Sequence, residues 1–336
     1  MPGKDCAKRA YGKTIGIIVI SVICRMCGGI RGNMVQSIES MLKKHREHMR
    51  PAVAARPEFC GVDGNDVYNP TAPFWYEGKK ILCARVEARD SEDSEAVFFE
   101  EVEKDIYVPA DGLPRFVLQD PCITRVAGQY ILGGTELFLH PENPKQIAWR
   151  TTFFCGDSLS GLRPLVKGPV GMKDVRLTEL ADKRIGIFTR PQGEKGGRGK
   201  IGFTVVDSLA DVTPEVMEEA PLLELFLPEE WGGVNAVYLL EDGELGVLGH
   251  VACFAPEGIR HYYPMAFRIN PVTGKYTMPV ILAERSEFLA GESKREDLVD
   301  VLFSGGLCWE DEKLFLYVGV SDCEVQYKQI APPFLV

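Results

Sequence analysis

The chain has 336 residues, a formal net charge of −10 and a sequence pI near 5.2. This acidic balance argues against nonspecific binding to nucleic acid and against an anionic membrane surface, so neither is an expected partner. The 34 glycines and 22 prolines are spread along the chain, as many short strands and turns require.

The first 33 residues differ from the rest. Basic residues precede Ile15 to Cys24, an apolar run too short to span a bilayer. This run is compatible with a signal-peptide core that lacks a convincing cleavage site, with an extra element packed on the fold, or with an extension upstream of a translation start at Met34. We favour the third interpretation, in which residues 1–33 are an N-terminal extension that precedes the native start.

The ten cysteines lie mostly in apolar runs, as Cys83 and Cys253 do. Buried free thiols in a reducing compartment explain this better than a disulfide framework, so the predicted location is the cytoplasm. Cys24 and Cys27 form a CxxC pair, but no second pair of ligands accompanies them. No metal site is predicted.

Residues 34–59 are expected to form an amphipathic helix and a linker. Val35, Ile38, Met41 and Leu42 recur at spacings of three and four, and a basic run, 43–46, follows before Pro51. Cations suit the negative end of the helix dipole, so this run is predicted to be a solvated helix end.

From residue 60 to 336 the pattern is that of strands. A hairpin is predicted over 74–86 with its turn at Glu77-Gly78, and further strand pairs over 96–102, 116–139, 184–190, 201–206, 237–254, 265–281 and 298–320. Only 214–220 and 292–297 resemble short helices. A four-stranded blade needs roughly 40–55 residues. The predicted fold is therefore all-β: a five-bladed β-propeller with an N-terminal helical extension. Two β-sandwiches are the alternative.

Asp120 is the candidate catalytic residue, because Asp120-Pro121 separates two apolar strands predicted at 116–118 and 123–126. Proline removes a backbone donor and extends the residue before it, which would place the Asp120 carboxylate at a strand edge facing a cavity. The alternative is that Asp-Pro simply begins a turn.

Other polar residues interrupt apolar strands at similar places along the chain. Several such groups would be costly to bury separately, so we expect them to share one polar cavity. They are Asn69, Arg85, Glu87, Lys173, Asp174, Arg190, His250 and Asp322.

These motifs resemble, in order, those of the β-mannoside phosphorylases of glycoside hydrolase family 130. Gln119-Asp-Pro-Cys-Ile is similar to the Glu-Asp-Pro-Arg-Ile motif of that family, with Cys122 in place of the arginine. The Asn-Pro, Lys-Asp-x-x-Leu, Arg-Pro, Tyr-His-Gly and Gly-Ala-Ala-Asp motifs match segments beginning at Asn69, Lys173, Arg190, Gly249 and Gly319. The resemblance covers about residues 65–330. The segment 84–94 further resembles the trypanosomatid mannosyltransferase/phosphorylases, which act on β-1,2-mannan.

The resemblance implies a role for each matched residue. Asp120 would be the general acid, acting through a sugar hydroxyl. Lys173, Arg190 and His250, with a looser match at His261, would bind phosphate. The mannosyl ring and its neighbours would be bound by the remaining polar residues, namely Asn69, Arg85, Glu87, Asp174 and Asp322.

The residue chemistry agrees with this assignment. An inverting glycosidase needs a second carboxylate to activate water, whereas in a phosphorylase the phosphate is the nucleophile and needs docking cations. The expected function is inverting β-mannoside phosphorolysis, or mannosyl transfer from mannose 1-phosphate or a sugar nucleotide, on β-1,2-linked manno-oligosaccharides. Phosphate would be a co-substrate, with no cofactor. A hydrolase using Glu87 or Asp322 as base, and a non-catalytic sugar-binding propeller, are the alternatives.

Overall fold

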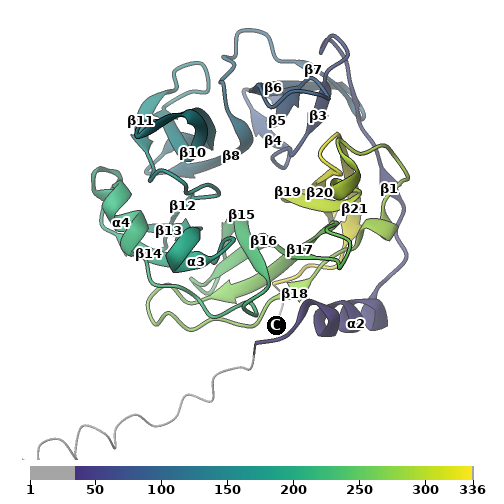
Figure 1. Ribbon diagram of the computed structural model, residues 1–336. Helices are drawn as coiled ribbons and strands as arrows, with labels where there is room; N and C mark the ends of the chain where they lie inside the picture. The colour runs from purple at the N-terminus through teal and green to yellow at the C-terminus, as the bar shows by residue number, and fades with distance from the viewer. Residues whose placement is uncertain (1–34, 335–336) are drawn as a thin grey trace, which may run out of the picture. The chain divides into compact units, whose positions relative to one another are not determined.

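A computed structural model describes residues 35–334 of the protein (Figure 1), so the predictions for residues 1–33 lie outside the described part. The helix α2 spans Ile38–His48 and begins at Ser37, whose side chain caps the amide of Ser40. Its buried residues are Ile38, Met41 and Leu42, which confirms the amphipathic helix that the spacing predicts.

The basic end of α2 is largely solvated, as predicted: Lys43, Lys44 and Arg46 are exposed, whereas His45 is half-buried. His45 Nε2 lies 2.6 Å from Glu287 Oε1, and Arg46 Nη2 lies 2.6 Å from Glu284 Oε2. A hydrogen bond at His45 and a partly exposed ion pair at Arg46 therefore tie this end of the helix to Glu287 and Glu284.

The rest of the described chain is almost entirely β-structure. The first group of strands comprises β2 (Glu58–Phe59), β3 (Asp66–Tyr68), β4 (Phe74–Tyr76), β5 (Lys79–Glu87), β6 (Ser94–Glu103) and β7 (Ile106–Pro109). The second comprises β8 (Gln119–Val126), β9 (Gln129–His140), β10 (Asn143–Gly156) and β11 (Arg163–Lys167). The third comprises β12 (Arg176–Glu179), β13 (Ile185–Thr189) and β14 (Gly202–Val206). These groups form sheets of six, four and three strands.

The remaining strands form one eight-stranded sheet. It contains β15 (Trp231–Leu239), β16 (Leu245–Phe254), β17 (Arg260–Ile269) and β18 (Val280–Ile281), then β19 (Asp300–Glu310), β20 (Lys313–Val320), β21 (Glu324–Ile330) and β1 (Ala54–Ala55). Strands β15 to β18 and β19 to β1 are two antiparallel runs, joined only by a short parallel pairing of β17 with β19 at His261↔Asp300 and Tyr262↔Val301. The N-terminal strand β1 pairs with β21 near the other end of the chain.

Helices beyond α2 are short. They are α3 (Gly193–Gly196), α4 (Pro214–Glu219) and single 3₁₀ turns at Leu209–Asp211, Arg285–Glu287 and Glu296–Leu298. The helix predicted at 214–220 is confirmed, and the structure is all-β as predicted. None of the helices among residues 35–334 combines the length and apolar composition needed to cross a bilayer.

The groups of strands lie around a common centre (Figure 1), with β8, β12, β15 and β19 nearest to it. Strand β12 contacts both β8 and β15, and β15 contacts β19. The inner strands therefore bring residues that are far apart in sequence to one central region.

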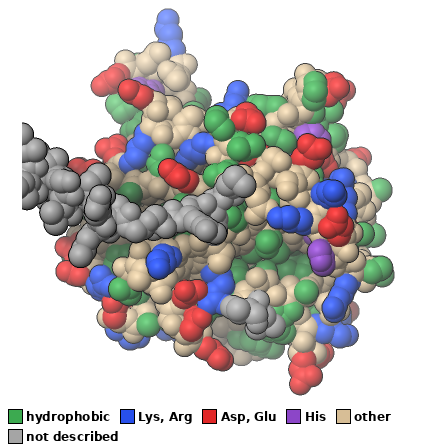
Figure 2. All heavy atoms as spheres, turned by 90° about the horizontal axis from the view of Figure 1, so that it is seen from below, with side chains coloured by type: hydrophobic (Ala, Val, Ile, Leu, Met, Phe, Trp, Pro, Cys, Tyr) green, Lys and Arg blue, Asp and Glu red, His purple; other side chains and the backbone are tan. Residues whose placement is uncertain are grey.

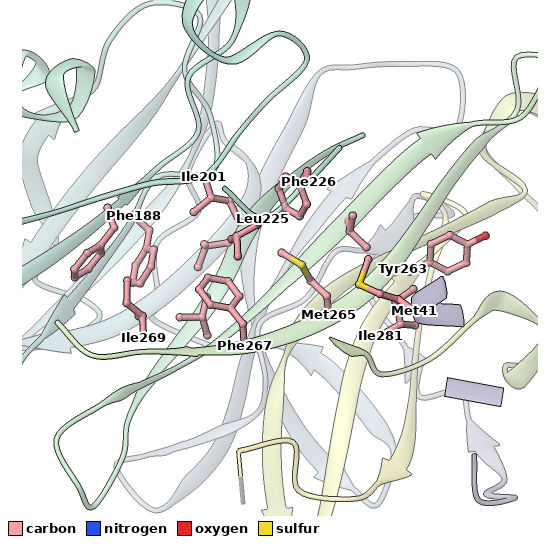
Figure 3. Close-up of a cluster of buried hydrophobic side chains, with 14 of the residues drawn as sticks. Met41, Phe188, Ile201, Leu225, Phe226, Tyr263, Met265, Phe267, Ile269 and Ile281 are labelled. Carbon is pink, nitrogen blue, oxygen red and sulfur yellow. The ribbon is translucent and has the colours of Figure 1, made fainter. Parts of the chain in front are cut away.

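The core lies between adjacent sheets. One cluster joins Phe188 and Ile201 from the third group to Met265 and Phe267 of β17, and Met41 of α2 packs on the same cluster (Figure 3). Burying such side chains contributes about 1.5–3 kcal/mol each, so α2 is held mainly by its apolar face. On the outer face shown in Figure 2, acidic and basic side chains are interspersed.

Candidate active site

A cavity of about 170 Å³ collects most of the residues that the sequence singles out. Its wall is formed where the inner strands and their neighbouring turns meet. The predicted site residues that line it are Asn69, Arg85, Asp120, Lys173, Asp174, Arg190, His250 and Asp322. The structure thus brings together eight of the ten predicted residues; Glu87 and His261 are not part of the wall.

Asp120 lies inside a strand, not at the end of one, so the prediction that Asp-Pro stops a strand at 116–118 is wrong. Strand β8 begins at Gln119 and continues to Val126, whereas Phe116 makes only an isolated bridge to Ala96. The pairing of β8 with β9 shifts between Gln119 and Cys122, so Asp120 and Pro121 form a bulge. A bulge re-aims side chains and leaves a residue unpaired, which accommodates the missing amide of proline.

Four cavity residues share an uncommon backbone conformation. Asn69, Asp120, Asp174 and Asp322 have φ values of 46°, 49°, 60° and 54°. Left-handed conformations cost energy for residues other than glycine, although Asn and Asp tolerate them best. Such strain gathers at functional sites, where surrounding structure holds it in place. Here the left-handed backbone turns the short polar side chain of each of these four residues into the cavity.

The Asp120 carboxylate is held by two neighbours. Its Oδ1 accepts hydrogen bonds from Asn69 Nδ2 at 2.8 Å and from Arg85 Nη1 at 3.3 Å. Burial alone would raise the pKa of Asp120, but the charges of Arg85 and Lys173 and the bond from Asn69 outweigh it and lower the pKa. Without a ligand, Asp120 is therefore ionised at neutral pH.

Glu87 lies behind Arg85 and does not face the cavity. Its side chain has no exposed surface, and Oε2 accepts from Arg85 Nε at 3.0 Å and Nη2 at 2.7 Å. Its Oε1 accepts from Tyr68 and Lys294. Two acceptor oxygens with four donors leave no place for a sugar hydroxyl, so the geometry makes Glu87 a positioning residue for Arg85.

The basic side of the cavity is formed by Lys173 and Arg190. Arg190 donates from Nε to Gly232 O at 2.9 Å, and its Nη1 lies 3.2 Å from Asp174 Oδ2. Among the described residues, neither Arg190 Nη1 nor Asp174 Oδ1 has a hydrogen-bond partner, although both atoms are buried. Buried polar atoms without hydrogen bonds are costly, and the ion pair with Asp174 Oδ2 offsets that cost for Arg190 Nη1 but not for Asp174 Oδ1.

Charges divide the carboxylates of the cavity into two kinds. Burial tends to raise the pKa of Asp174, but Arg190, Lys173 and Arg176 lower it to about 2, so Asp174 is a permanent anion. Burial and the nearby charge of Asp120 raise the pKa of Asp322, even though Arg85 and Lys173 oppose them. Asp322 is thus the carboxylate that most readily takes up a proton.

His250 is a neutral hydrogen-bonding group. Burial lowers the pKa of its ring to about 3, which outweighs the attraction of Asp174. The ring is stacked on Tyr262, with centroids 5.3 Å apart, and its Nδ1 lies 2.9 Å from Asn235 Oδ1. The expectation that His250 adds positive charge is therefore wrong, because the buried ring does not hold a second proton near neutral pH.

Glycine at position 233 allows this packing. A Cβ atom there would lie 2.8 Å from Arg190 Cδ and 3.0 Å from His250 Cε1. The two phosphate-binding candidates are therefore packed against one stretch of backbone.

His261 faces away from the cavity. Its Nδ1 contacts Asp300 Oδ2 across the parallel pairing of β17 with β19, while its neighbour Tyr262 lines the cavity. Successive side chains of a strand point to opposite faces, so the loose sequence match falls one position from the residue that faces the site.

Sequence reasoning missed a set of charged residues at the rim, Glu92, Arg260, Lys294 and Arg295, together with Gln119 and Phe303 in the wall. Glu92 Oε2 lies 3.2 Å from Arg85 Nη2, and its Oε1 lies 3.1 Å from Lys294 Nζ. Glu92 and Lys294 are far apart in sequence, so no local pattern could pair them; only Gln119, next to Asp120, carried a local signal.

A larger cavity, of about 340 Å³, contains none of the predicted site residues. Its wall includes Cys122 and Arg176, which come two residues after Asp120 and Asp174, and Asn235 of β15. The chemistry of an acid beside cations belongs to the smaller cavity, which we take as the candidate active site.

Comparison with known proteins places this geometry in a family. The family model described as "Protein of unknown function (DUF1861)" matches residues 43–336. Among solved structures, a mannose phosphorylase from Leishmania mexicana in complex with a phosphate ion is 31% identical, with a TM-score of 0.82 over 88% of this chain and 93% of that one. The chain therefore belongs to the DUF1861 family. No curated protein matches it.

Two further solved structures are similar to this chain. A GDP-Man-dependent mannosyltransferase from Leishmania mexicana is 28% identical, with a TM-score of 0.80 over 89% of this chain and 95% of that one. A β-1,2-mannobiose phosphorylase from Listeria innocua is 13% identical, with a TM-score of 0.57 over 79% of this chain and 89% of that one. At that identity the second likeness concerns the fold alone. The family resemblance inferred from the motifs is confirmed.

Proposed function

We propose that the protein is an inverting β-mannoside phosphorylase and mannosyltransferase built on a five-bladed β-propeller. The substrates would be β-1,2-linked manno-oligosaccharides, with phosphate, mannose 1-phosphate or a sugar nucleotide as the second substrate. The observation that carries the proposal is one cavity that holds the Asp120 carboxylate together with Lys173 and Arg190. The Leishmania relatives named above, a phosphorylase and a mannosyltransferase, support the same class of reaction.

In phosphorolysis, a phosphate oxygen forms a bond to the anomeric carbon while the bond to the leaving sugar oxygen breaks. The leaving oxygen takes a proton that originates on Asp120 and passes through a sugar hydroxyl. The products are mannose 1-phosphate and a shortened oligosaccharide, and the reverse reaction elongates an acceptor. Lys173 and Arg190 hold the phosphate through their positive charges.

Asp120 must gain its proton in the substrate complex, because Arg85 and Lys173 favour its ionised form in the free cavity. A bound phosphate offsets the charge of Lys173 and Arg190. Its own negative charge also raises the pKa of the neighbouring carboxylate. Phosphate would therefore prepare the acid as well as serve as nucleophile.

A hydrolase is the second candidate, favoured by the additional carboxylates in the cavity. Asp322 lines the cavity close to Asp120, and Glu92 stands at the rim, so either could activate water. The position of Lys173 and Arg190 argues against a hydrolase. Both residues line the cavity, whereas a hydrolase needs no cations there and would allow them to point outward.

The deciding experiment measures release of mannose and of mannose 1-phosphate from short β-1,2-mannosides with and without phosphate. We expect turnover only with phosphate, and about 100- to 10,000-fold slower turnover in Asp120→Asn with unchanged unfolding. Full-rate mannose release without phosphate would instead identify a hydrolase. Saturable mannoside binding without turnover under any donor would identify a binding protein.

The donor of the synthetic direction is tested by supplying mannose 1-phosphate or GDP-mannose to a mannoside acceptor. Elongation with release of phosphate or of GDP would distinguish the two. We also propose that the enzyme works in the cytoplasm, where thiols remain reduced; the seven cysteines of the described chain are all free, which supports a reducing compartment.

A further inference from the structure

Asn235 is a bulge residue that reaches the back of the His250 ring. The register of β15 against β16 shifts between Val234 and Ala236, so Asn235 has no partner residue in the ladder. Its terminal amide lies 2.9 Å from His250 Nδ1 and 3.0 Å from Ser304 Oγ. Asn235 and His250 are 4% and 1% exposed, so water does not complete this network.

The contacts of Ser304 indicate which end of the Asn235 amide faces His250. Its Oγ also lies 2.7 Å from the carbonyl oxygen of Gly249, which can only accept. Ser304 has one hydroxyl proton and two acceptor neighbours if the amide presents Oδ1. One close contact between two oxygens then lacks a proton, and Nδ2 of Asn235 is buried without a partner in the described chain.

Rotating the amide by 180° removes both problems, since oxygen and nitrogen exchange places at almost no steric cost. Nδ2 then donates one proton to His250 Nδ1 and the other to Ser304 Oγ, and Ser304 donates to Gly249. Only Oδ1 remains without a partner, and a carbonyl oxygen tolerates this better than an amide with two protons does.

We infer that Asn235 and Ser304 hold the neutral His250 ring in the tautomer that carries its proton on Nε2. Nδ1 faces Asn235, so the protonated nitrogen is the one on the cavity side of the ring. His250 is thereby a hydrogen-bond donor that needs no positive charge, which suits an anionic oxygen in the cavity. Asn235 is a positioning residue that acts through His250, and this inference rests on the proposed phosphate site.

The direct test is nuclear magnetic resonance of the full chain containing isotope-labelled histidine, with His250→Gln used to assign the ring signals. We expect His250 to carry its only ring proton on Nε2 across the neutral pH range, with or without inorganic phosphate. A proton on Nδ1 would overturn the inference. Because this readout needs no activity, it stands apart from any failure of the proposed function.

The functional test is Asn235→Asp, which replaces a donor by a group that only accepts. We expect the ring proton to move to Nδ1 and the KM for phosphate to rise about tenfold at neutral pH, with a smaller change in kcat. The new carboxylate favours the doubly protonated ring, so the defect should shrink as pH falls. Asn235→Gln should retain the donor and lie nearer the original enzyme. An unchanged KM in a folded Asn235→Asp variant would contradict the inference.

Discussion

At the scale of single residues, the cavity works through differences between chemically similar groups. Asp120, Asp174 and Asp322 are three carboxylates in one wall, yet neighbouring cations lower the pKa of the first two, while desolvation and the charge of Asp120 raise that of the third. The same wall lowers the pKa of His250, so that its ring stays neutral even in mildly acidic solution. Environment, and not residue type, therefore distributes the protons of the site.

Asp322→Asn should stabilise the protein at neutral pH while it impairs turnover. Because the folded-state pKa of Asp322 is raised, folding stability falls as pH rises from the unfolded value near 3.8 through the folded value, and asparagine removes this loss. We expect about 1 kcal/mol more stability at pH 7, roughly 2 °C in Tm, measured by urea and thermal unfolding.

The control for this prediction is Asp297→Asn at the rim. Its hydrogen bond with Arg295 lowers the pKa of Asp297, so the ionised carboxylate stabilises the folded state. Replacing Asp297 by asparagine should therefore give no gain in stability at pH 7. Lower stability of Asp322→Asn at pH 7, with stability unchanged at low pH, would show that the Asp322 charge is favourable in the folded state.

At the scale of elements, bulges and ion pairs decide where the strands present their side chains. Bulges occur in β8 at Asp120, in β15 at Asn235 and in β19 between Ser304 and Gly306. The first lies in the candidate active site, whereas Asn235, Gly305 and Gly306 line the larger cavity. The helix α2 lies outside this ring of strands and is fixed by Glu287, which contacts His45 and also Lys328 Nζ at 2.5 Å.

Glu287→Gln should destabilise the protein without changing its activity. Its hydrogen bonds with His45 and Lys328 overcome burial and lower the pKa of Glu287 to about 2. The stability it contributes is therefore complete above the unfolded value near 4.5 and is lost as pH falls toward about 2. We expect a loss of about 2 kcal/mol at pH 7, because glutamine still forms hydrogen bonds but leaves Lys328 without its counter-charge.

Unfolding in urea at pH 7 and at pH 4 measures this effect, and the gap between the two proteins should narrow at the lower pH. Glu284→Gln is the matched control, since its partner Arg46 is largely exposed and such pairs contribute little. Glu284 and Glu287 also cap the 3₁₀ turn Arg285–Glu287, and an equal loss in both variants would mean that this capping, and not the buried pair, carries the stability.

At the scale of the whole molecule, the proposed phosphate site couples ligand binding to folding. Residues from every strand group meet at the cavity, so an anion bound there holds the groups together. Inorganic phosphate at about one hundred times its Kd should stabilise the protein by about 2.7 kcal/mol, roughly 5 °C in Tm.

Thermal unfolding with increasing phosphate at constant ionic strength measures this shift. Arg190→Gln should abolish it, whereas Arg150→Gln should retain it, because Arg150 pairs with Glu136 away from the cavity. A full phosphate-dependent shift in Arg190→Gln would place the anion elsewhere.

The sequence by itself determined the elements and most of the site. Periodicity placed α2 and the turn of the 74–86 hairpin, where Glu77 and Gly78 both take the positive φ values that the turn requires. Ordered motifs selected seven residues of the cavity wall, since each motif is local and its residues act together, and Arg85 stood out as a polar residue in an apolar strand. Residue types and their spacing within short segments were sufficient to predict the helix, the turn and these cavity residues.

Only the tertiary structure decided how the selected residues behave. The pairing of β8 with β9 placed Asp120 on a bulge within a strand, and the alternation of β17 turned His261 outward and Tyr262 inward. Burial made His250 neutral, and contacts between distant segments put Glu87 behind Arg85 and brought Glu92 to Lys294. Pairing register, burial and charge neighbours arise between segments that meet only on folding, so no local pattern in the chain encodes them.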